Sequence, residues 1–164
     1  MYTYIYNHNT NYRDYSTNGG GGDCTNFASQ ILRAGGWTDV NGYYTDYHYW
    51  WYTFANQSYT WVGAYPVYNF LNYSGRGTPK NRSSDLVVGD ILQANWGHGE
   101  GISHSMIVST KHNDGRVYLS YHTNDTLDRP LSDIVATSPG ASFYAWHIND
   151  TFSSLKPQTV VGKK

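Results

Sequence analysis

The spacing of apolar residues along the chain predicts one clear helix near the N-terminus. After a run of glycines at 19–22, apolar side chains recur at helical spacing at Cys24, Phe27, Ala28, Ile31 and Leu32. Asp23 precedes them as a predicted N-cap, whose carboxylate would accept bonds from the free amides of the first turn. Gly35 and Gly36 end the pattern. We therefore predict a helix over residues 24–34.

The second half of the chain carries the shorter period and the turn signals of β-strands. Residues 86–94 predict a turn and a buried strand, residues 104–110 and 117–122 predict a hairpin, and residues 142–147 predict a further strand. A helix followed by an antiparallel meander is an α+β plan. We assign residues 1–150 to a single domain and residues 151–164 to a C-terminal tail or linker.

Three other segments have weaker patterns. The first eighteen residues are polar and aromatic, and they predict a short helix or an extended arm packed on the body. The dense aromatic residues at 39–56 are typical of a core wedge or of a cleft wall. Residues 72–84, rich in glycine, serine, asparagine and basic side chains, predict an exposed loop.

Charge and composition narrow the range of partners. Eleven basic and twelve acidic residues give a net charge of -1, so nucleic acid is not expected as a partner. No apolar run approaches the roughly 20 residues that a membrane helix needs, and no membrane insertion is expected. The 17 tyrosines and 6 tryptophans, among many neutral polar residues, are typical of surfaces that bind sugars and peptides. Most of the tyrosines are nevertheless expected in the core and in half-buried sheet positions.

The single cysteine, Cys24, stands at the start of the predicted helix. The helix dipole and the free N–H groups at this end favour a thiolate, the form in which cysteine is a nucleophile. The glycines before it leave the backbone open to the close approach of a substrate. A lone cysteine is, however, often only a small buried hydrophobe. The residues alone leave both interpretations open.

A nucleophilic cysteine needs a base, and His104 is the best placed of seven histidines. It opens a predicted strand after the glycine-rich loop 96–101, where its ring can reach a cleft. Depending on the turn, the hairpin register places Thr123 or Asp125 opposite His104. The segment 122–125 therefore offers His104 a polar neighbour in either register.

These segments together resemble the putative amidase domain family of papain-like cysteine hydrolases, related to NlpC-type and CHAP cell-wall enzymes. The resemblance rests on Gly22-Asp23-Cys24-Thr25-Asn26-Phe27-Ala28-Ser29-Gln30 with Ala34-Gly35-Gly36-Trp37. It continues through Gly89-Asp90-Ile91-Leu92, His104-Ser105-Met106-Ile107-Val108 and Tyr121-His122-Thr123-Asn124-Asp125. It implies a papain-like α+β fold, with the nucleophile helix packed on an antiparallel sheet. It also implies hydrolysis of an amide bond in bacterial peptidoglycan, either as an N-acetylmuramoyl-L-alanine amidase or as an endopeptidase.

The resemblance implies roles for individual residues. Cys24 is the expected nucleophile, which would form a thioester, and His104 is the expected base. The third catalytic residue is expected to be Asn124, with His122 as the alternative. The Cys24 amide and the Asn18 side chain are expected to form the oxyanion hole. Trp50, Trp51 and Asp23 are expected to contact the substrate.

Two rival functions stay open at this point. One is a zinc-dependent amidase, although His98-Gly99-Glu100 lacks the paired cysteines of a deaminase site and no His-Glu-x-x-His occurs. The other is a non-catalytic cell-wall carbohydrate-binding module. For the cysteine enzyme we expect no metal, no cofactor and a monomer. We expect it to be secreted or to face the cell wall, with a signal peptide removed or with export by another route, as phage endolysins use.

Overall fold

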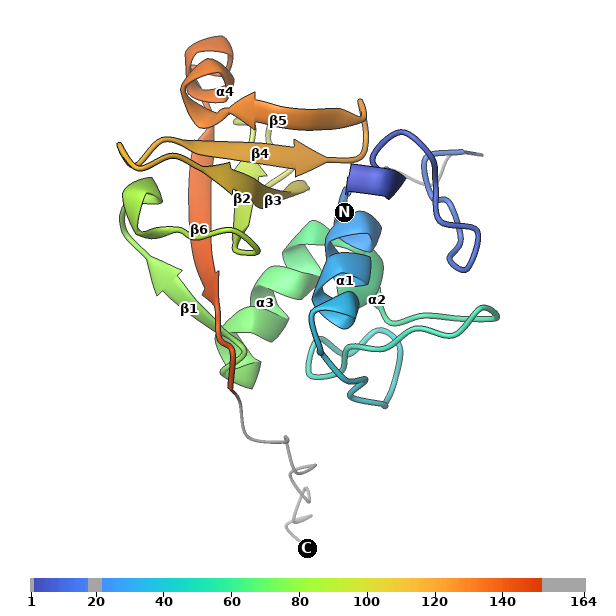
Figure 1. The fold of residues 1–164 in the computed structure, drawn as a ribbon. Coiled ribbons are helices and arrows are strands. Elements are labelled where there is room, and N and C mark those ends of the chain that lie inside the picture. Colours follow the sequence, from blue (N-terminus) through green and yellow to red (C-terminus); the bar gives the residue numbers. More distant parts are fainter. Residues whose placement is uncertain (1, 18–21, 152–164) are drawn as a thin grey trace, which may run out of the picture.

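A six-stranded antiparallel sheet lies at the centre of the structure, a computed structural model that describes residues 2–17 and 22–151. The strand order is β1-β6-β2-β3-β4-β5 (Figure 1). The strands are β1 (Gly77–Lys80), β2 (Ile91–Asn95), β3 (His104–Lys111), β4 (Val117–Tyr121), β5 (Thr126–Pro130) and β6 (Ser142–Ile148). The predicted α+β class is confirmed. Residue 18 and almost all of the predicted tail, 151–164, lie outside the described residues.

Four α-helices accompany the sheet within the described residues. They are α1 (Cys24–Ala34), α2 (Tyr59–Val62), α3 (Ala64–Ser74) and α4 (Leu131–Thr137), with short 3₁₀ turns η1 (Tyr2–Tyr4) and η2 (Ser83–Asp85). The prediction of a helix over residues 24–34 is confirmed. Among the described residues, no helix has the length and apolar character needed to cross a bilayer.

The sheet separates two apolar clusters, because successive side chains of a strand point to opposite faces. Ile91 and Ile107 face a cluster formed with α1, α2 and α3, and Leu92 and Met106 face the other. The second cluster is closed by Ile134 of α4. Figure 1 shows α1 and α3 together on one side and α4 at the far edge, beside β5.

The segment 72–84, predicted as an exposed loop, contains the end of α3 and the strand β1. β1 pairs with β6, from Gly77 opposite Ile148 to Lys80 opposite Ala145. The prediction was wrong because Pro79 and Lys80 are weak strand formers. They are tolerated here because β1 is an edge strand, with one side unpaired.

Trp50 belongs to the core, so its predicted role in lining a substrate groove is wrong. The side chain is fully buried in the cluster under α1, and its Nε1 donates a hydrogen bond to Ser29 Oγ at 3.2 Å. The backbone of Trp50 bridges to Val40, which fixes the segment against the body. Trp51 points the other way, is half-buried, and donates from Nε1 to the Gly42 carbonyl at 3.0 Å.

We expect Trp50→Ala to lower the free energy of unfolding by about 3–5 kcal/mol, because it removes a large, fully buried side chain. The matched variant Trp51→Ala removes a half-buried side chain of the same size and should cost clearly less. Urea unfolding followed by circular dichroism measures both. Equal losses in the two variants would contradict the assignment of Trp50 to the core.

Candidate active site

Cys24 is the first residue of α1 and lies against the start of β3. Its Sγ is 3.7 Å from Thr25 Oγ1, and Thr25 Oγ1 is in turn 3.0 Å from Ser105 Oγ. The thiol is buried, with 6% of the residue exposed. As the first helical residue, Cys24 has a backbone N–H without an acceptor inside the helix. Such an amide is available to an oxyanion.

The expected thiolate is not the resting form of Cys24. Burial raises the pKa of the thiol, and it outweighs the hydrogen bonds from the Ser105 backbone and from Thr25, which lower it. The adjacent Asp23 charge raises the pKa further. The helix N-terminus alone therefore does not ionise this cysteine, and a thiol at neutral pH needs a base to become a nucleophile.

His104 opens β3, as predicted, and directly precedes the Ser105 that meets α1. Its ring packs against Trp96 and Tyr121, with ring centroids 5.6 and 4.9 Å away. Burial lowers the pKa of His104 to about 4, so the imidazole is neutral at pH 7 and can accept a proton. Among the described residues, no hydrogen bond joins its ring to Cys24 Sγ. Catalytic hydrogen bonds often form only in the substrate complex.

The hairpin register agrees with the first of the two predicted alternatives near the site. Ile107 pairs with Ser120 and Val108 with Leu119, and the register shifts beyond Val108 toward the turn. Continued toward the start of β3, this register places Thr123 opposite His104. Thr123 lies between the two residues considered for the third catalytic position.

His122 has hydrogen-bond partners at both ring nitrogens. Nδ1 lies 2.6 Å from Asp23 Oδ2, and Nε2 lies 2.8 Å from the Tyr4 carbonyl. Because both partners are acceptors, an ionised Asp23 requires the imidazolium form of His122. Burial lowers the pKa of His122, but the bonds to Asp23 and Tyr4 outweigh burial and raise it overall. His122 thus contacts the residue before the nucleophile and makes no hydrogen bond to His104.

Asn124 lies in the turn between β4 and β5. It is exposed, with a φ of 66°, a left-handed conformation that asparagine tolerates. Its carbonyl accepts a hydrogen bond from the Thr126 hydroxyl. Within the described part of the chain, neither Asn124 nor His122 is hydrogen-bonded to His104, so the identity of a third catalytic residue stays a prediction.

Asp23 stands at the predicted N-cap position but does not cap the helix with its side chain. The carboxylate is completely buried and accepts bonds from the Tyr15 N–H and the Asn26 amide, at 3.0 and 2.8 Å, besides contacting His122. Contact with a substrate through this carboxylate is therefore excluded in this conformation, and that prediction was wrong. A buried carboxylate with several partners positions the backbone before Cys24.

The backbone before Cys24 is also held by the turn after β4. The Asp23 N–H donates to Thr123 Oγ1 at 2.9 Å. Gly22 has a φ of +113°, and a Cβ there would lie only 2.7 Å from the same hydroxyl oxygen. Glycine is thus required at this position both by its conformation and by the contact.

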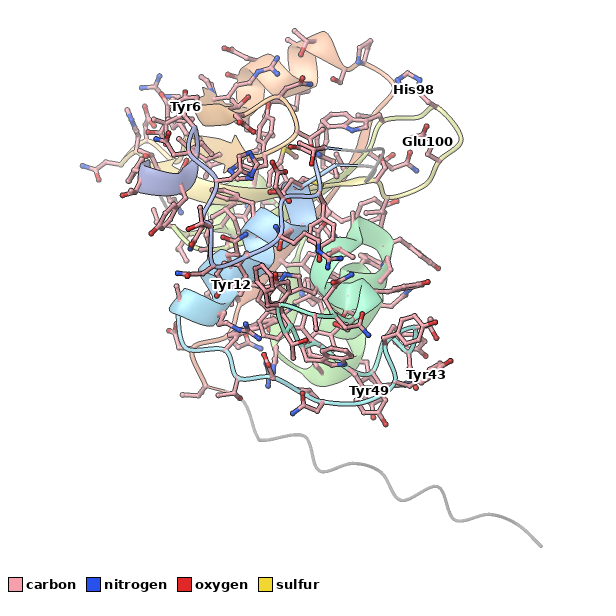
Figure 2. All side chains as sticks on the ribbon, turned by 90° about the vertical axis from the view of Figure 1, so that its right-hand side faces the viewer. Tyr6, Tyr12, Tyr43, Tyr49, His98 and Glu100 are labelled. Atoms are coloured by element: carbon pink, nitrogen blue, oxygen red, sulfur yellow. The ribbon has the colours of Figure 1, made fainter. Side chains whose placement is uncertain are left out.

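His98 and Glu100 lie in an exposed loop between β2 and β3, where Figure 2 shows them far from Tyr12 of the N-terminal arm. Asn18, proposed for the oxyanion hole, lies outside the described residues. His8 of the arm lies 3.5 Å from both Asp14 and Asp23, and neither His8 nor Asp14 belongs to a periodic or spaced sequence pattern that would have marked it.

The fold and this site define an α+β protein with one buried cysteine at a helix start, beside a strand that a buried histidine opens. The chain belongs to the putative amidase domain family, whose profile matches residues 1–146. It is 30% identical over 148 residues to the protein YhbB of Bacillus subtilis (strain 168), described as uncharacterized. That match covers 87% of this chain and 45% of YhbB, so the chain spans less than half of that relative. No solved structure matches the chain.

Proposed function

We propose that this protein is a cysteine hydrolase that cleaves an amide bond in bacterial peptidoglycan, with Cys24 as nucleophile and His104 as base. Family membership supports an amidase. The observation that carries the proposal is the buried Cys24 at the start of α1, in contact with the strand that His104 opens.

The protonation states of the two residues suit general-base catalysis. His104 is neutral at pH 7 because burial lowers its pKa to about 4, and the thiol of Cys24 still holds its proton. As the sulfur attacks the substrate carbonyl carbon, His104 takes the thiol proton and then passes it to the departing amine. Water then hydrolyses the resulting thioester, and a carboxylate and the free thiol are the products. The Cys24 amide and Asn18 would bind the oxyanion.

Peptidoglycan suits the surface of this protein better than a charged polymer does. The net charge is -1, and many tyrosines are partly exposed, with Tyr6 and Tyr43 each more than 60% exposed (Figure 2). Tyrosine rings stack on sugar C–H faces, while their hydroxyls bind polar groups. The proposed enzyme is a monomer that acts at the cell wall, outside the cytoplasm.

The same exposed tyrosines fit the rival function, a carbohydrate-binding module. Release of new amino groups from purified peptidoglycan separates the two, with wild type and Cys24→Ala compared in parallel. Release by the wild type and not by the variant supports the proposal, and mass spectra of the fragments identify the bond. Equal release by both rejects Cys24 as nucleophile. Retained wall binding with no release by either favours the binding module.

The third catalytic residue can be tested without straining the backbone. We expect Asn124→Gly to lower kcat about tenfold, less than loss of the nucleophile or the base, because an orienting group acts only through His104. Glycine accepts the positive φ of this position, so the variant removes the side chain without straining the backbone. Steady-state kinetics on a soluble muropeptide measure the effect. Unchanged rates would favour His122, and His122→Gln would then be the next variant.

A further inference from the structure

Three side chains that offer metal-binding atoms, those of His8, Asp23 and His122, converge beside the start of α1, and Asp14 lies next to His8. His8 Nδ1 lies 3.5 Å from Asp14 Oδ1 and 3.5 Å from Asp23 Oδ2, while His122 Nδ1 lies 2.6 Å from Asp23 Oδ2. One ligand atom each of His8, Asp23 and His122 lies within 4.8 Å of the other two. The rings of His8 and His122 are 4.4 Å apart. We propose that His8, Asp14, Asp23 and His122 form a structural binding site for a divalent transition metal, best matched by Zn²⁺.

The two separations measured from His8 Nδ1 fit a four-coordinate zinc ion. Zinc binds imidazole nitrogen and carboxylate oxygen at about 2.0–2.2 Å, so tetrahedral ligands lie about 3.3–3.5 Å apart. Both separations from His8 Nδ1 have this value. The separation between His122 Nδ1 and Asp23 Oδ2 is shorter, because a proton now joins the two atoms, and it must widen by about 0.7 Å around a metal.

Hydrogen bonds to the second ring nitrogen of His122 and to the second carboxylate oxygen of Asp23 already orient these two ligands. A metal-binding histidine usually donates its other N–H to a carbonyl or a carboxylate, which fixes the tautomer. His122 makes this bond from Nε2 to the Tyr4 carbonyl, which leaves Nδ1 for a metal. Asp23 likewise accepts from Tyr15 and Asn26 at Oδ1, which leaves Oδ2 toward His8.

The charges of the site balance when the metal is bound. Two ionised carboxylates and two neutral imidazoles neutralise one divalent cation. Binding displaces one proton from His122 Nδ1, which passes to solvent, and Nδ1 and Asp23 Oδ2 both become ligands. Nitrogen and oxygen donors in equal number favour zinc over magnesium or calcium, which take oxygen alone.

The metal would join three parts of the chain that are distant in sequence. His8 and Asp14 belong to the N-terminal arm, Asp23 directly precedes α1, and His122 follows β4. In Figure 2 Tyr6 and Tyr12 mark this arm, which passes in front of α1. Neither Cys24 nor His104 belongs to this set of ligands, and the role of the metal is to fasten the arm over the helix that carries the thiol.

The test uses the full chain, first freed of metal by a chelator that is then removed. With zinc added, we expect about one bound zinc per chain by mass spectrometry of metals. We also expect Tm to rise by about 5 °C or more when zinc exceeds its Kd about a hundredfold. His8→Asn and Asp14→Asn should lose both effects and still fold, because both side chains are partly exposed.

The matched control is His48→Asn. His48 Nδ1 also lies 2.6 Å from a carboxylate, that of Asp46, but the pair is isolated on the surface, so zinc binding should stay unchanged. Cys24→Ala should also retain the zinc. The proposal is overturned if the wild type binds no zinc, if His8→Asn retains it, or if Cys24→Ala loses it. None of these measurements depends on hydrolase activity, so failure here is distinct from failure of the proposed function.

Discussion

Replacement of Cys24 by alanine is expected to lower kcat at least about 10³-fold, because no other side chain can form the thioester. The buried thiol meets Thr25 and the Ser105 backbone, and a methyl group fits the same space without strain. Stability should therefore change little. Kinetics on a soluble muropeptide and a thermal unfolding curve, both recorded on one preparation, measure the two effects.

The chain itself supplies a second measurement, because Cys24 is its single cysteine. An alkylating reagent can modify no other thiol, so loss of activity should follow the extent of alkylation one to one. The raised pKa of the buried thiol predicts slow alkylation at pH 7 and faster alkylation as the pH rises. Cys24→Ser, which keeps a hydroxyl in place, should also be inactive. Full activity of fully alkylated protein would refute the nucleophile assignment.

His104→Ala is expected to lower kcat about 10³-fold through loss of the general base. Because burial lowers the pKa of His104 to about 4, the imidazole gains a proton only near that pH. Activity should therefore persist down to about pH 5 and fall as the pH approaches 4. A free histidine would instead cause the fall near pH 6.5. The dependence of kcat/KM on pH between 3.5 and 8 tests this.

A matched control for His104 lies at the other end of the same hairpin. His112 stacks on Tyr118 beyond β3 and is exposed, so His112→Ala should keep the rate and the pH profile of the wild type. An acidic limb near pH 6.5 in the wild type would assign the base to a histidine less buried than His104.

Local sequence signals predicted the elements that local interactions determine. The bounds of α1 followed from its apolar period and the flanking glycines, and the hairpin followed from its turn residues. The helix α3 was missed even though Ala64, Val67, Phe70 and Leu71 have helical spacing, because tyrosine, phenylalanine and asparagine are modest helix formers. Tertiary packing overrides such a propensity, and a single sequence does not reveal that packing.

The candidate active site also depends on tertiary packing that a single sequence does not reveal. The positions of Cys24 at the start of a helix and of His104 at the start of a strand were predicted correctly, and their catalytic roles stay predictions. The partners of Asp23 were not predicted, because His122 lies 99 residues away along the chain and His8 lies in an arm without a periodic pattern. Trp50 was misassigned because a segment rich in aromatic residues can form either part of the core or the wall of a cleft. Only the fold distinguishes the two.

The contact between Gly22 and Thr123 affects how a Gly-Asp-Cys triplet should be interpreted in other sequences. Gly22 is required by a hydroxyl from a distant turn, and Asp23 by a histidine beside that turn. Both requirements come from the architecture and would persist in a relative that had lost the thiol. Glycine and aspartate in this triplet therefore indicate how the chain is folded, and only the cysteine bears on the proposed reaction.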